Sequence, residues 1–328
     1  MESGKFAMNS RRLLTSSPKT ILAYNSQQLY EAIKMSESRT ISAVARVKGP
    51  NVVDGVSNVE LCAAFGADII TLGVYDPRNP YFPGLPSKVE KEPDDSILDQ
   101  VQIDLGRGWT ISTVKEAIGR PIASALFGTE ESFVPGMAES FNDVIANREN
   151  ATLLVEQGCD IVQYMDWMAD TETLVRTINM LKEVVGDQAL LSYSKPNGYG
   201  LFDQHPRKEF ITENELLSVI EAGAQMVEIP AVGTLPGFTQ EKVTKLVNII
   251  HDGGALANLW IASSQEGGDT DTIKRIGYYS KMTGADIFTI SDVWTTESVP
   301  PPENIMALSI SIRGVRHTYR RMAMSILR

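Results

Sequence analysis

Four residues of types that move protons or attack carbonyl groups stand where apolar runs of the sequence end. They are two lysines and two carboxylic acids: Lys48, Asp166, Lys195 and Glu228. A lysine whose pKa is lowered by desolvation or a nearby cation can act as a base or form a Schiff base. A carboxylate on the opposite wall can carry the proton. The four residues therefore predict a catalytic centre, and the alternative is an internal salt bridge that only fills space.

Alternation along the apolar runs indicates which side chains share one side of a strand. In the first run one side is wholly apolar, and the other side ends in Arg46 and Lys48. The same test places Glu228 on the inward side of its own run, and Gln163 and Asn258 are further candidates for buried polar positions. Because a buried charge is costly unless it is paired, we expect Arg46 or Lys48 to pair with Glu228.

Two glycine-bearing segments predict the binding of an anionic substrate. Ser264 opens a loop that contains Gly267 and Gly268 directly before a helical pattern, and free amides at a helix N-terminus attract anions. Ser291, which follows the last apolar run, and Arg46, at the end of the first run, are further candidates for binding the anion. Arg107 stands between two glycines, and a guanidinium group there suits a phosphate or carboxylate. The alternative is that these segments only cap helices.

The sequence contains none of the histidine or cysteine spacings that are typical of metal sites. No cofactor is predicted, but Asp76, Asp166 and Glu228 could hold Mg²⁺ through water, because hard cations take oxygen ligands. Asp292 is a further carboxylate for such a site, and His205 could reach it.

One repeated signal organises the chain. Seven helical patterns end in a glycine that a short apolar run soon follows: Gly66, Gly119, Gly158, Gly186, Gly223, Gly254 and Gly284. An eighth run, residues 41–48, precedes the series. Runs of this kind fit strands that are buried on both faces of a parallel sheet. Eight strand–helix units predict a (β/α)8 TIM barrel. An open doubly wound sheet is the weaker alternative, because no G-x-G-x-x-G follows the first run.

The repeat also divides the chain. Residues 1–38 are expected to form an N-terminal arm and an extra helix that caps the barrel, and residues 39–328 a single barrel domain. The connections after the second and third strands, residues 76–109 and 128–144, are long. Both would lie on the C-terminal face, where barrels place their active sites. They are interpreted as flaps over the site or as dimer contacts.

Composition excludes several classes of protein. The chain has 328 residues, with 41 acidic against 30 basic side chains and a net charge of −11, so a nucleic-acid partner is not expected. No stretch approaches the roughly 18 apolar residues of a membrane helix, and the N-terminal segment has no secretory apolar run. Cys62 and Cys159 form no disulfide framework. A cytoplasmic location is therefore expected.

Residues 54–70, Asp-Gly-Val-Ser-Asn-Val-Glu-Leu-Cys-Ala-Ala-Phe-Gly-Ala-Asp-Ile-Ile, resemble the first unit of phosphoenolpyruvate mutase and isocitrate lyase barrels. Those families carry an Asp-x-Asp metal motif after the third strand, which residues 122–128 lack. The run of units is also similar to ribulose-phosphate-binding barrels. The whole chain resembles an uncharacterised bacterial barrel family that is sometimes labelled haloacid-dehalogenase-like hydrolase. Its nearest motif to the aspartate nucleophile, Asp269-Thr-Asp271, opens a helix, and Ile273 stands where that motif has threonine.

Three functions remain open at this point. The first is a lyase, aldolase or isomerase that acts on a small anionic or phosphorylated carbonyl compound or sugar at the C-terminal face of the barrel, which the fold favours by analogy alone. The second is a catalytically silent barrel that senses a sugar phosphate or a partner protein through residues 76–109. The third is a metal-assisted hydrolase that uses the three carboxylates named for Mg²⁺. The apolar residues of the last helix, Asn304–Leu327, also predict a homodimer or larger homo-oligomer.

Overall fold

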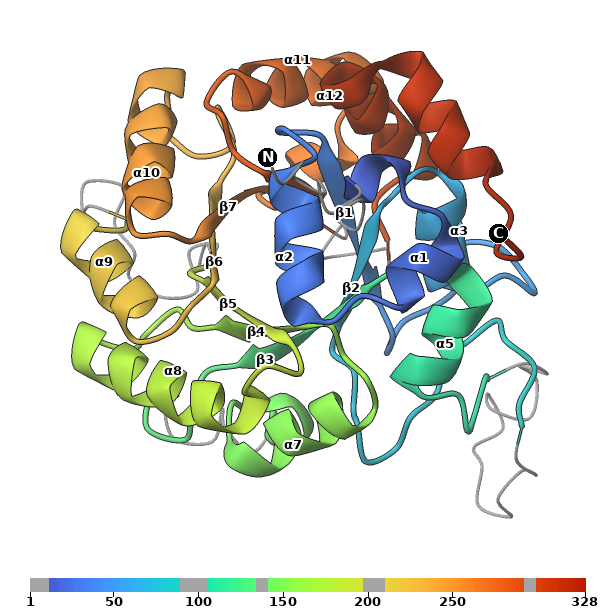
Figure 1. The fold of residues 1–328 in the computed structure, drawn as a ribbon, viewed down its shortest axis with the longest axis horizontal. Helices are drawn as coiled ribbons and strands as arrows, with labels where there is room; N and C mark the ends of the chain where they lie inside the picture. The colour runs from blue at the N-terminus through green and yellow to red at the C-terminus, as the bar shows by residue number, and fades with distance from the viewer. Residues whose placement is uncertain (1–11, 89–104, 134–140, 197–209, 292–298) are drawn as a thin grey trace, which may run out of the picture.

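The strands pair in chain order, and the last strand returns to the first, so that the sheet closes on itself (Figure 1). The computed structural model describes residues 12–88, 105–133, 141–196, 210–291 and 299–328. Every strand pair is parallel, which confirms the predicted (β/α)8 barrel. The strands are β1 (Thr40–Arg46), β2 (Ile69–Gly73), β3 (Ile122–Phe127), β4 (Ile161–Met165), β5 (Leu190–Ser194), β6 (Met226–Pro230), β7 (Leu256–Ile261) and β8 (Ile287–Ile290).

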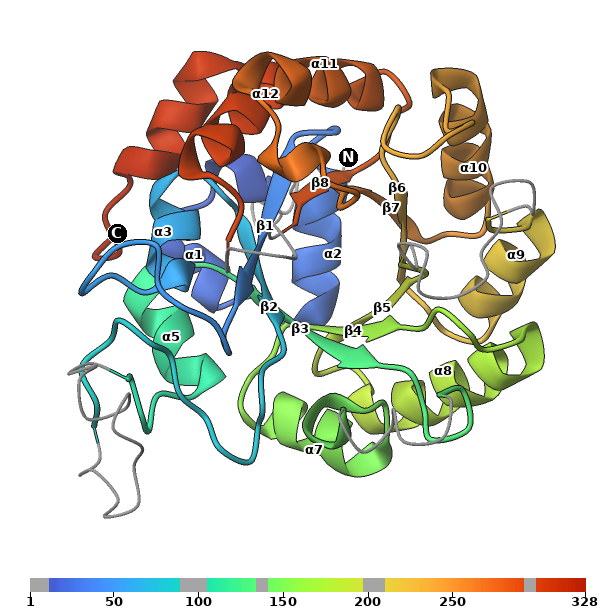
Figure 2. The same ribbon diagram turned by 180° about the vertical axis from the view of Figure 1, so that it is seen from behind.

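Helices surround the barrel on all sides, and one more helix lies across its N-terminal end (Figures 1 and 2). A capping box opens α3, where the Ser57 hydroxyl accepts the Glu60 N–H and the Glu60 carboxylate accepts the Ser57 N–H. The helices are α1 (Pro18–Leu22), α2 (Ser26–Lys34), α3 (Asn58–Ala64), α5 (Ile111–Ile118), α7 (Arg148–Glu156), α8 (Thr171–Val185), α9 (Glu213–Glu221), α10 (Gln240–Asp252), α11 (Thr270–Lys281) and α12 (Pro302–Ala323). Short 3-10 turns are η1 (Leu13–Thr15), η2 (Asn142–Val144) and η3 (Gln265–Gly267).

The inward-facing side chains change character from one end of the barrel to the other. At the N-terminal end they are apolar, and Leu29, Ile33 and their neighbours on α1 and α2 pack against them. This apolar layer consists of Ile69, Ala123, Ile161, Leu190, Met226, Leu256 and Ile287. The extra helix is therefore the lid that keeps water from the lower barrel, and polar groups are confined to the layers above it.

The start of each odd-numbered strand is bound by the side chain of a residue just before the next strand. Asp160 shows the pattern: its N–H donates to Ile122 O (2.9 Å), and its carboxylate accepts the Ile122 N–H (2.8 Å). Lys115 of α5 binds the same carboxylate at 2.7 Å. The arrangement recurs with Asp68, Gln225 and Asp286. Their side chains form hydrogen bonds with Arg313, Lys182 and His251, respectively. The tripeptide Gly-(Ala or Cys)-(Asp or Gln) therefore precedes each even-numbered strand, and it marks four similar pairs of neighbouring strands.

Substitutions at equivalent positions of this repeat should lower the free energy of unfolding by different amounts. Asp160→Ala removes a charged partner of Lys115 and leaves the Ile122 N–H buried without an acceptor, so we expect a loss of about 2–3 kcal/mol of unfolding free energy. Gln225 is neutral and makes longer contacts, 3.4 Å to the Leu191 N–H and 3.2 Å to Lys182. Gln225→Ala should therefore cost about 1 kcal/mol. Urea unfolding of both variants measures the difference, and equal costs would refute this interpretation.

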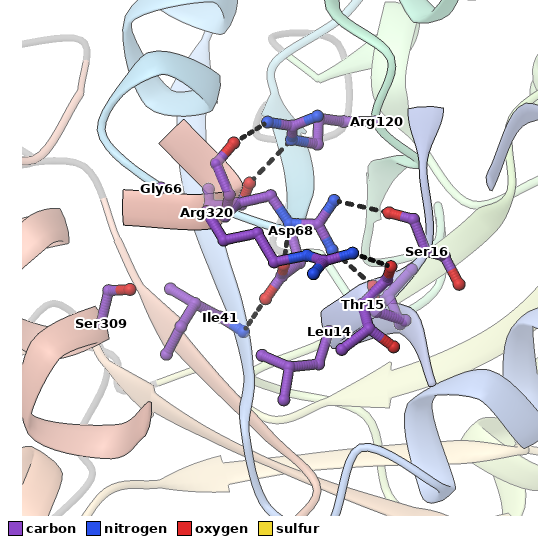
Figure 3. A network of polar contacts seen from close by, with 12 residues as sticks. Leu14, Thr15, Ser16, Ile41, Gly66, Asp68, Arg120, Ser309 and Arg320 are labelled. Atoms are coloured by element: carbon purple, nitrogen blue, oxygen red, sulfur yellow. Dashed lines mark hydrogen bonds and ion pairs between the residues drawn. The ribbon is translucent and has the colours of Figure 1, made fainter. Parts of the chain in front are cut away.

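The first of the four positions carries a larger network (Figure 3). Asp68 is fully buried and pairs with Arg313 and Arg321, two residues of α12. Eight residues of straight helix would separate the two guanidinium groups by about 12 Å, but Gly314 adopts φ 77°, ψ 164° and kinks the helix. Arg321 also donates to carbonyl oxygens of η1 and its flank, and Arg120 donates to Arg321 O at 3.0 Å. The network ties both ends of the described chain to β2.

Candidate functional site

Above the apolar layer, the barrel interior is lined by polar side chains. Strand register places them on the inward face: Ser42, Thr71, Gln163, Ser192, Ser194, Glu228, Asn258 and Thr289. We call this set the polar belt. Ser42 and Thr71 share a hydrogen bond of 3.1 Å, and Thr289 donates to Asn258 at 2.9 Å. Glu228 is the titratable member of the belt, and its surroundings decide what the belt can do.

Neutral groups hold the Glu228 carboxylate. Gln163 Nε2 donates to one oxygen at 2.5 Å, and Ser192 Oγ donates to the other at 2.9 Å. Glu228 is 3% exposed, and its burial raises the pKa of its carboxyl group to about 7. Hydrogen bonds from Ser192, Gln163 and Asn258 favour the ionised form and offset part of this rise. Ser194 Oγ is also buried and reaches no well-formed hydrogen bond. A carboxyl group with this pKa can both give and accept a proton at neutral pH.

The predicted ion pair between Glu228 and Arg46 or Lys48 is wrong. Within the described residues no ion pair joins them, and Lys48 instead meets Asp143 at 3.0 Å on the exposed rim. The physical reason is that β1 ends at Arg46, so strand alternation no longer directs Lys48. Arg46 keeps the inward register at the C-terminal end of β1, where it lines a small pocket with Asn51 and Phe82.

Lys195 does not lie at the barrel mouth. It shares the outward side of β5 with Tyr193, and it pairs with Glu215 of α9 at 2.8 Å. Tyr193 donates to the other oxygen of Glu215 at 2.8 Å. The expectation that Lys195 faces the other candidates is therefore wrong, because one residue of strand separates the two faces of a sheet.

Asp166 is buried at the end of β4, but its oxygens are occupied by its own loop. One oxygen accepts the N–H groups of Met168 (2.8 Å) and Ala169 (2.9 Å). The other accepts the Tyr164 hydroxyl at 2.8 Å. This arrangement fixes the turn after the strand, as short acidic side chains commonly do.

The glycine-rich loop after β7 uses its own amides. The Gly267 N–H donates to Ser264 O (3.3 Å), and the Gly268 N–H donates to Gln265 O (2.8 Å). Ser264 has φ 81°, a strained value for a residue with a side chain, and Asn304 of α12 holds Gly268 O at 2.8 Å. The segment expected to bind an anion is therefore a 3-10 turn before α11. Its glycine N–H groups already donate to carbonyl oxygens of the same turn.

Besides Arg46, two other anion candidates, Ser291 and Arg107, lie on backbone connections. Ser291 follows β8, and its N–H donates to Ile261 O at 3.0 Å. Arg107 pairs with Tyr81 in an isolated bridge, and its N–H donates to Ser87 Oγ at 3.2 Å. Helix α5 begins at Ile111, so Arg107 precedes the helix rather than opening it. A role for either residue in binding an anion stays a prediction.

The carboxylates proposed for Mg²⁺ are not brought together. Asp76 accepts the Arg78 N–H at 2.9 Å, Asp166 is held by its own turn, and Glu228 lies inside the barrel. Among the residues with described positions, no group of three or more His, Cys, Asp or Glu side chains could hold a metal ion. Asp292 and His205 lie outside the described residues.

Sequence reasoning missed an aromatic cluster at the C-terminal ends of β3, β4 and β7. Its rings are Phe127, Phe133, Phe141, Trp167 and Trp260. Phe127 and Trp167 stack with ring centroids 5.8 Å apart, and a Cβ at Gly128 would come within 2.5 Å of the Phe133 ring. Strand alternation was the available signal, because Trp260 shares the inward side with Asn258. The cluster gives the mouth above the polar belt an aromatic wall.

A family model described as Domain of unknown function (DUF7916) matches residues 14–328. The chain belongs to this family. Membership supports neither the label haloacid-dehalogenase-like hydrolase nor a specific kinship with phosphoenolpyruvate mutase, and Asp269 of the supposed nucleophile motif serves as the N-cap of α11. None of the curated proteins matches the sequence of this family member. Among its described helices, none has the length and apolar composition needed to span a bilayer.

Several solved structures resemble this DUF7916 chain weakly. A putative fructose-1,6-biphosphate aldolase from Coccidioides immitis is 12% identical over 92% of this chain and 98% of its own, with a TM-score of 0.49. Deoxyribose phosphate aldolase from Aeropyrum pernix is 13% identical over 85% and 92%, with a TM-score of 0.45. Dihydrodipicolinate synthase from Oceanobacillus iheyensis is 12% identical over 79% and 69%, with a TM-score of 0.44. Likenesses of this size carry no conclusion about what the chain acts on.

Proposed function

We propose that this protein is an acid–base enzyme of the lyase or isomerase type, in which Glu228 moves a proton on a small anionic carbonyl compound. The observation that carries the proposal is a fully enclosed carboxyl group, held by Gln163 and Ser192 inside the barrel, below the face where barrel enzymes place their chemistry. Two neutral donors orient the group without neutralising it. Its protonated and ionised forms are both populated near neutral pH.

The chemistry that suits this group is proton transfer next to a carbonyl. Glu228 would take the proton from carbon and return it to a neighbouring atom, while Arg46 at the end of β1 would hold the anionic part of the substrate. Because Glu228 is 3% exposed, the reacting carbon has to pass the aromatic cluster. Schiff-base chemistry is disfavoured, because Lys195 faces α9 and Lys48 is paired on the rim.

The experiment is hydrogen exchange in D₂O, followed by ¹H NMR. The wild-type chain is incubated at pH 7 with pyruvate, 2-oxoglutarate, oxaloacetate or dihydroxyacetone phosphate, and loss of the signal of the proton next to the carbonyl is timed. We expect exchange on at least one compound, and a fall of about 10²-fold or more in Glu228→Gln.

Asp271→Asn is the control, because Asp271 is an exposed partner of Lys274, and it should exchange at the wild-type rate. Borohydride with the same compounds should leave no adduct on a lysine. The proposal fails if wild type accelerates no exchange in this panel, or if Glu228→Gln retains the wild-type rate.

A further inference from the structure

One hydroxyl group of the polar belt has no partner. The other hydroxyls of the belt form hydrogen bonds of 2.9 to 3.1 Å with belt neighbours, and they belong to Ser42, Thr71, Ser192 and Thr289. Ser194 is fully buried as well, but its Oγ has no hydrogen-bond partner among the described atoms. A buried hydroxyl in this state costs free energy, which a ligand can recover by supplying the missing hydrogen bond. Ser194 is therefore a candidate for contact with the substrate.

Ser194 lies beside Glu228 on the inner face of the barrel. The two residues pair in the register of β5 and β6, and Ser192, which shares the inward face of β5 with Ser194, donates to the Glu228 carboxylate at 2.9 Å. Ser194 is the last residue of β5, so its hydroxyl lies on the mouth side of Ser192. Burial raises the pKa of Glu228 and Ser194 lowers it in part, so the hydroxyl is close to the carboxylate, although the two are not aligned as a hydrogen bond.

A carboxyl group and a neutral hydroxyl that border one space can move two protons. The carboxyl group of Glu228 can give and accept a proton near neutral pH, and the hydroxyl of Ser194 is both a donor and an acceptor. Within the described residues Glu228 takes part in no ion pair, and Gln163 and Ser192, which hold it, are neutral. A carbonyl group bound here is therefore polarised by a hydrogen bond and not by a cation, as in enzymes that combine a carboxylate base with a neutral donor.

We propose that Ser194 and Glu228 together interconvert a 2-hydroxyaldehyde and its ketone isomer, so that the substrate is a short sugar phosphate. This inference rests on the proposed function, and it selects isomerisation over the cleavage of a carbon–carbon bond. Isomerisation needs one proton transfer between neighbouring carbons and one between their oxygens, and the two residues supply these two transfers. The phosphate is the anionic part that Arg46 would hold.

The reaction balances without a further reactant. The Glu228 carboxylate takes the proton of C2, and the electron pair of the C2–H bond forms a C1=C2 double bond. The π pair of C1=O1 moves to O1, which takes the proton of the Ser194 hydroxyl. In the second half, Ser194 Oγ takes the proton of O2, the C2=O2 bond forms, and C1 takes the proton that Glu228 holds. Both residues return to their starting states, and no oxidant or reductant is consumed.

The test follows the isomerisation itself, in D₂O and by ¹H NMR. The wild-type chain is incubated at pH 7 with D-erythrose 4-phosphate or D-ribose 5-phosphate. Pyruvate is the comparison compound, because its carbonyl has no neighbouring hydroxyl, so that it can exchange its methyl protons but cannot isomerise. We expect the ketone isomer of at least one sugar phosphate, with one deuterium at C1, because the proton held by Glu228 exchanges with the solvent before it is returned.

Two serine variants make the assignment specific. Ser194→Ala should slow the isomerisation about 10²-fold, the usual result of removing one donor to a developing oxyanion. It should not lower the free energy of unfolding in urea, because the hydroxyl makes no hydrogen bond that the fold would lose. Ser124→Ala is the matched control: its Oγ is also fully buried without a partner, but Ser124 lies on the outward face of β3, since Ala123 and Ala125 face inward. This variant should isomerise at the wild-type rate.

The outcomes separate this inference from the proposed function. Exchange on pyruvate without isomerisation of either sugar phosphate would overturn the inference and leave Glu228 as the base. The same holds if Ser194→Ala isomerises at the wild-type rate, or if Ser124→Ala slows the reaction as much as Ser194→Ala does. A Ser194→Ala chain that loses stability together with its rate would show that the hydroxyl serves the fold. If no compound of either panel exchanges or isomerises, the inference and the proposed function fall together.

Discussion

Asp68→Asn should destabilise the protein by about 3–5 kcal/mol, the usual result of breaking a buried ion pair from one side. Arg313 and Arg321 would keep their charges with side-chain exposures of 0% and lose their common carboxylate. Arg120 adds a third buried guanidinium, and burial lowers its pKa to about 9. The amide cannot compensate these charges. Urea unfolding at pH 7 measures the loss.

The pH dependence supplies a second readout for the same variant. Burial alone would raise the pKa of Asp68, but Arg313 and Arg321 outweigh it, so that the pKa lies below its ordinary value. The ionised carboxylate therefore stabilises the fold above the ordinary pKa of an aspartate, and this contribution is lost as the pH falls. Asp68→Asn should flatten the acid side of the stability curve. Asp271→Asn, on the surface, should change neither value, and an Asp68→Asn loss below 1 kcal/mol would contradict the network.

Glu228→Gln should have the opposite effect and stabilise the protein at alkaline pH. Burial raises the pKa of Glu228 to about 7 from 4.5, so between these values the unfolded chain holds fewer protons than the folded one. Stability of the wild type therefore falls as the pH rises through this window. The full cost is about 3 kcal/mol once the group is ionised, and a neutral glutamine avoids it.

Thermal or urea unfolding at pH 5 and pH 8 tests this directly. The variant should match wild type at pH 5 and exceed it by up to about 3 kcal/mol at pH 8. Glu215→Gln is the matched control, because it also removes a buried carboxylate but breaks the pair with Lys195, and it should destabilise. If Glu228→Gln is less stable than wild type at pH 8, the carboxylate is held by a cation and the proposed function loses its basis.

The sequence predicted the strands and some side-chain directions correctly, but it did not predict the positions of the two lysines. The glycine-run repeat predicted the strands β2 to β8, and the apolar run at residues 41–48 predicted β1, because a glycine turn and a β-rich apolar run are local features of the chain. The inward direction of Glu228, Gln163 and Asn258 followed from alternation, which is also local. Lys48 and Lys195 were misplaced, because the last residue of a strand and the face that a flanking side chain takes depend on pairing with neighbouring segments.

The prediction that the loop Ser264–Gly268 binds an anion was wrong for a related reason. Gly267 and Gly268 have the composition of an anion cradle, but whether an amide is free depends on the turn that the loop adopts. Asn304, far along the chain, helps to fix that turn. For the aromatic cluster, alternation could have placed Trp260 on the inward side, but its contact with the other rings comes from segments that only the closed barrel brings together.

By itself, the sequence determined the order of the elements and the inward position of Glu228, since each depends on short-range periodicity, whereas the closure of the barrel depends on the pairing of β8 with β1. Only the tertiary structure decided which charges meet. Arg313 and Arg321 reach Asp68 across some 250 residues, and Glu228 is left among neutral donors. The free energy of a charge depends on its distance from other charges and from water, and those distances exist only once the chain has folded.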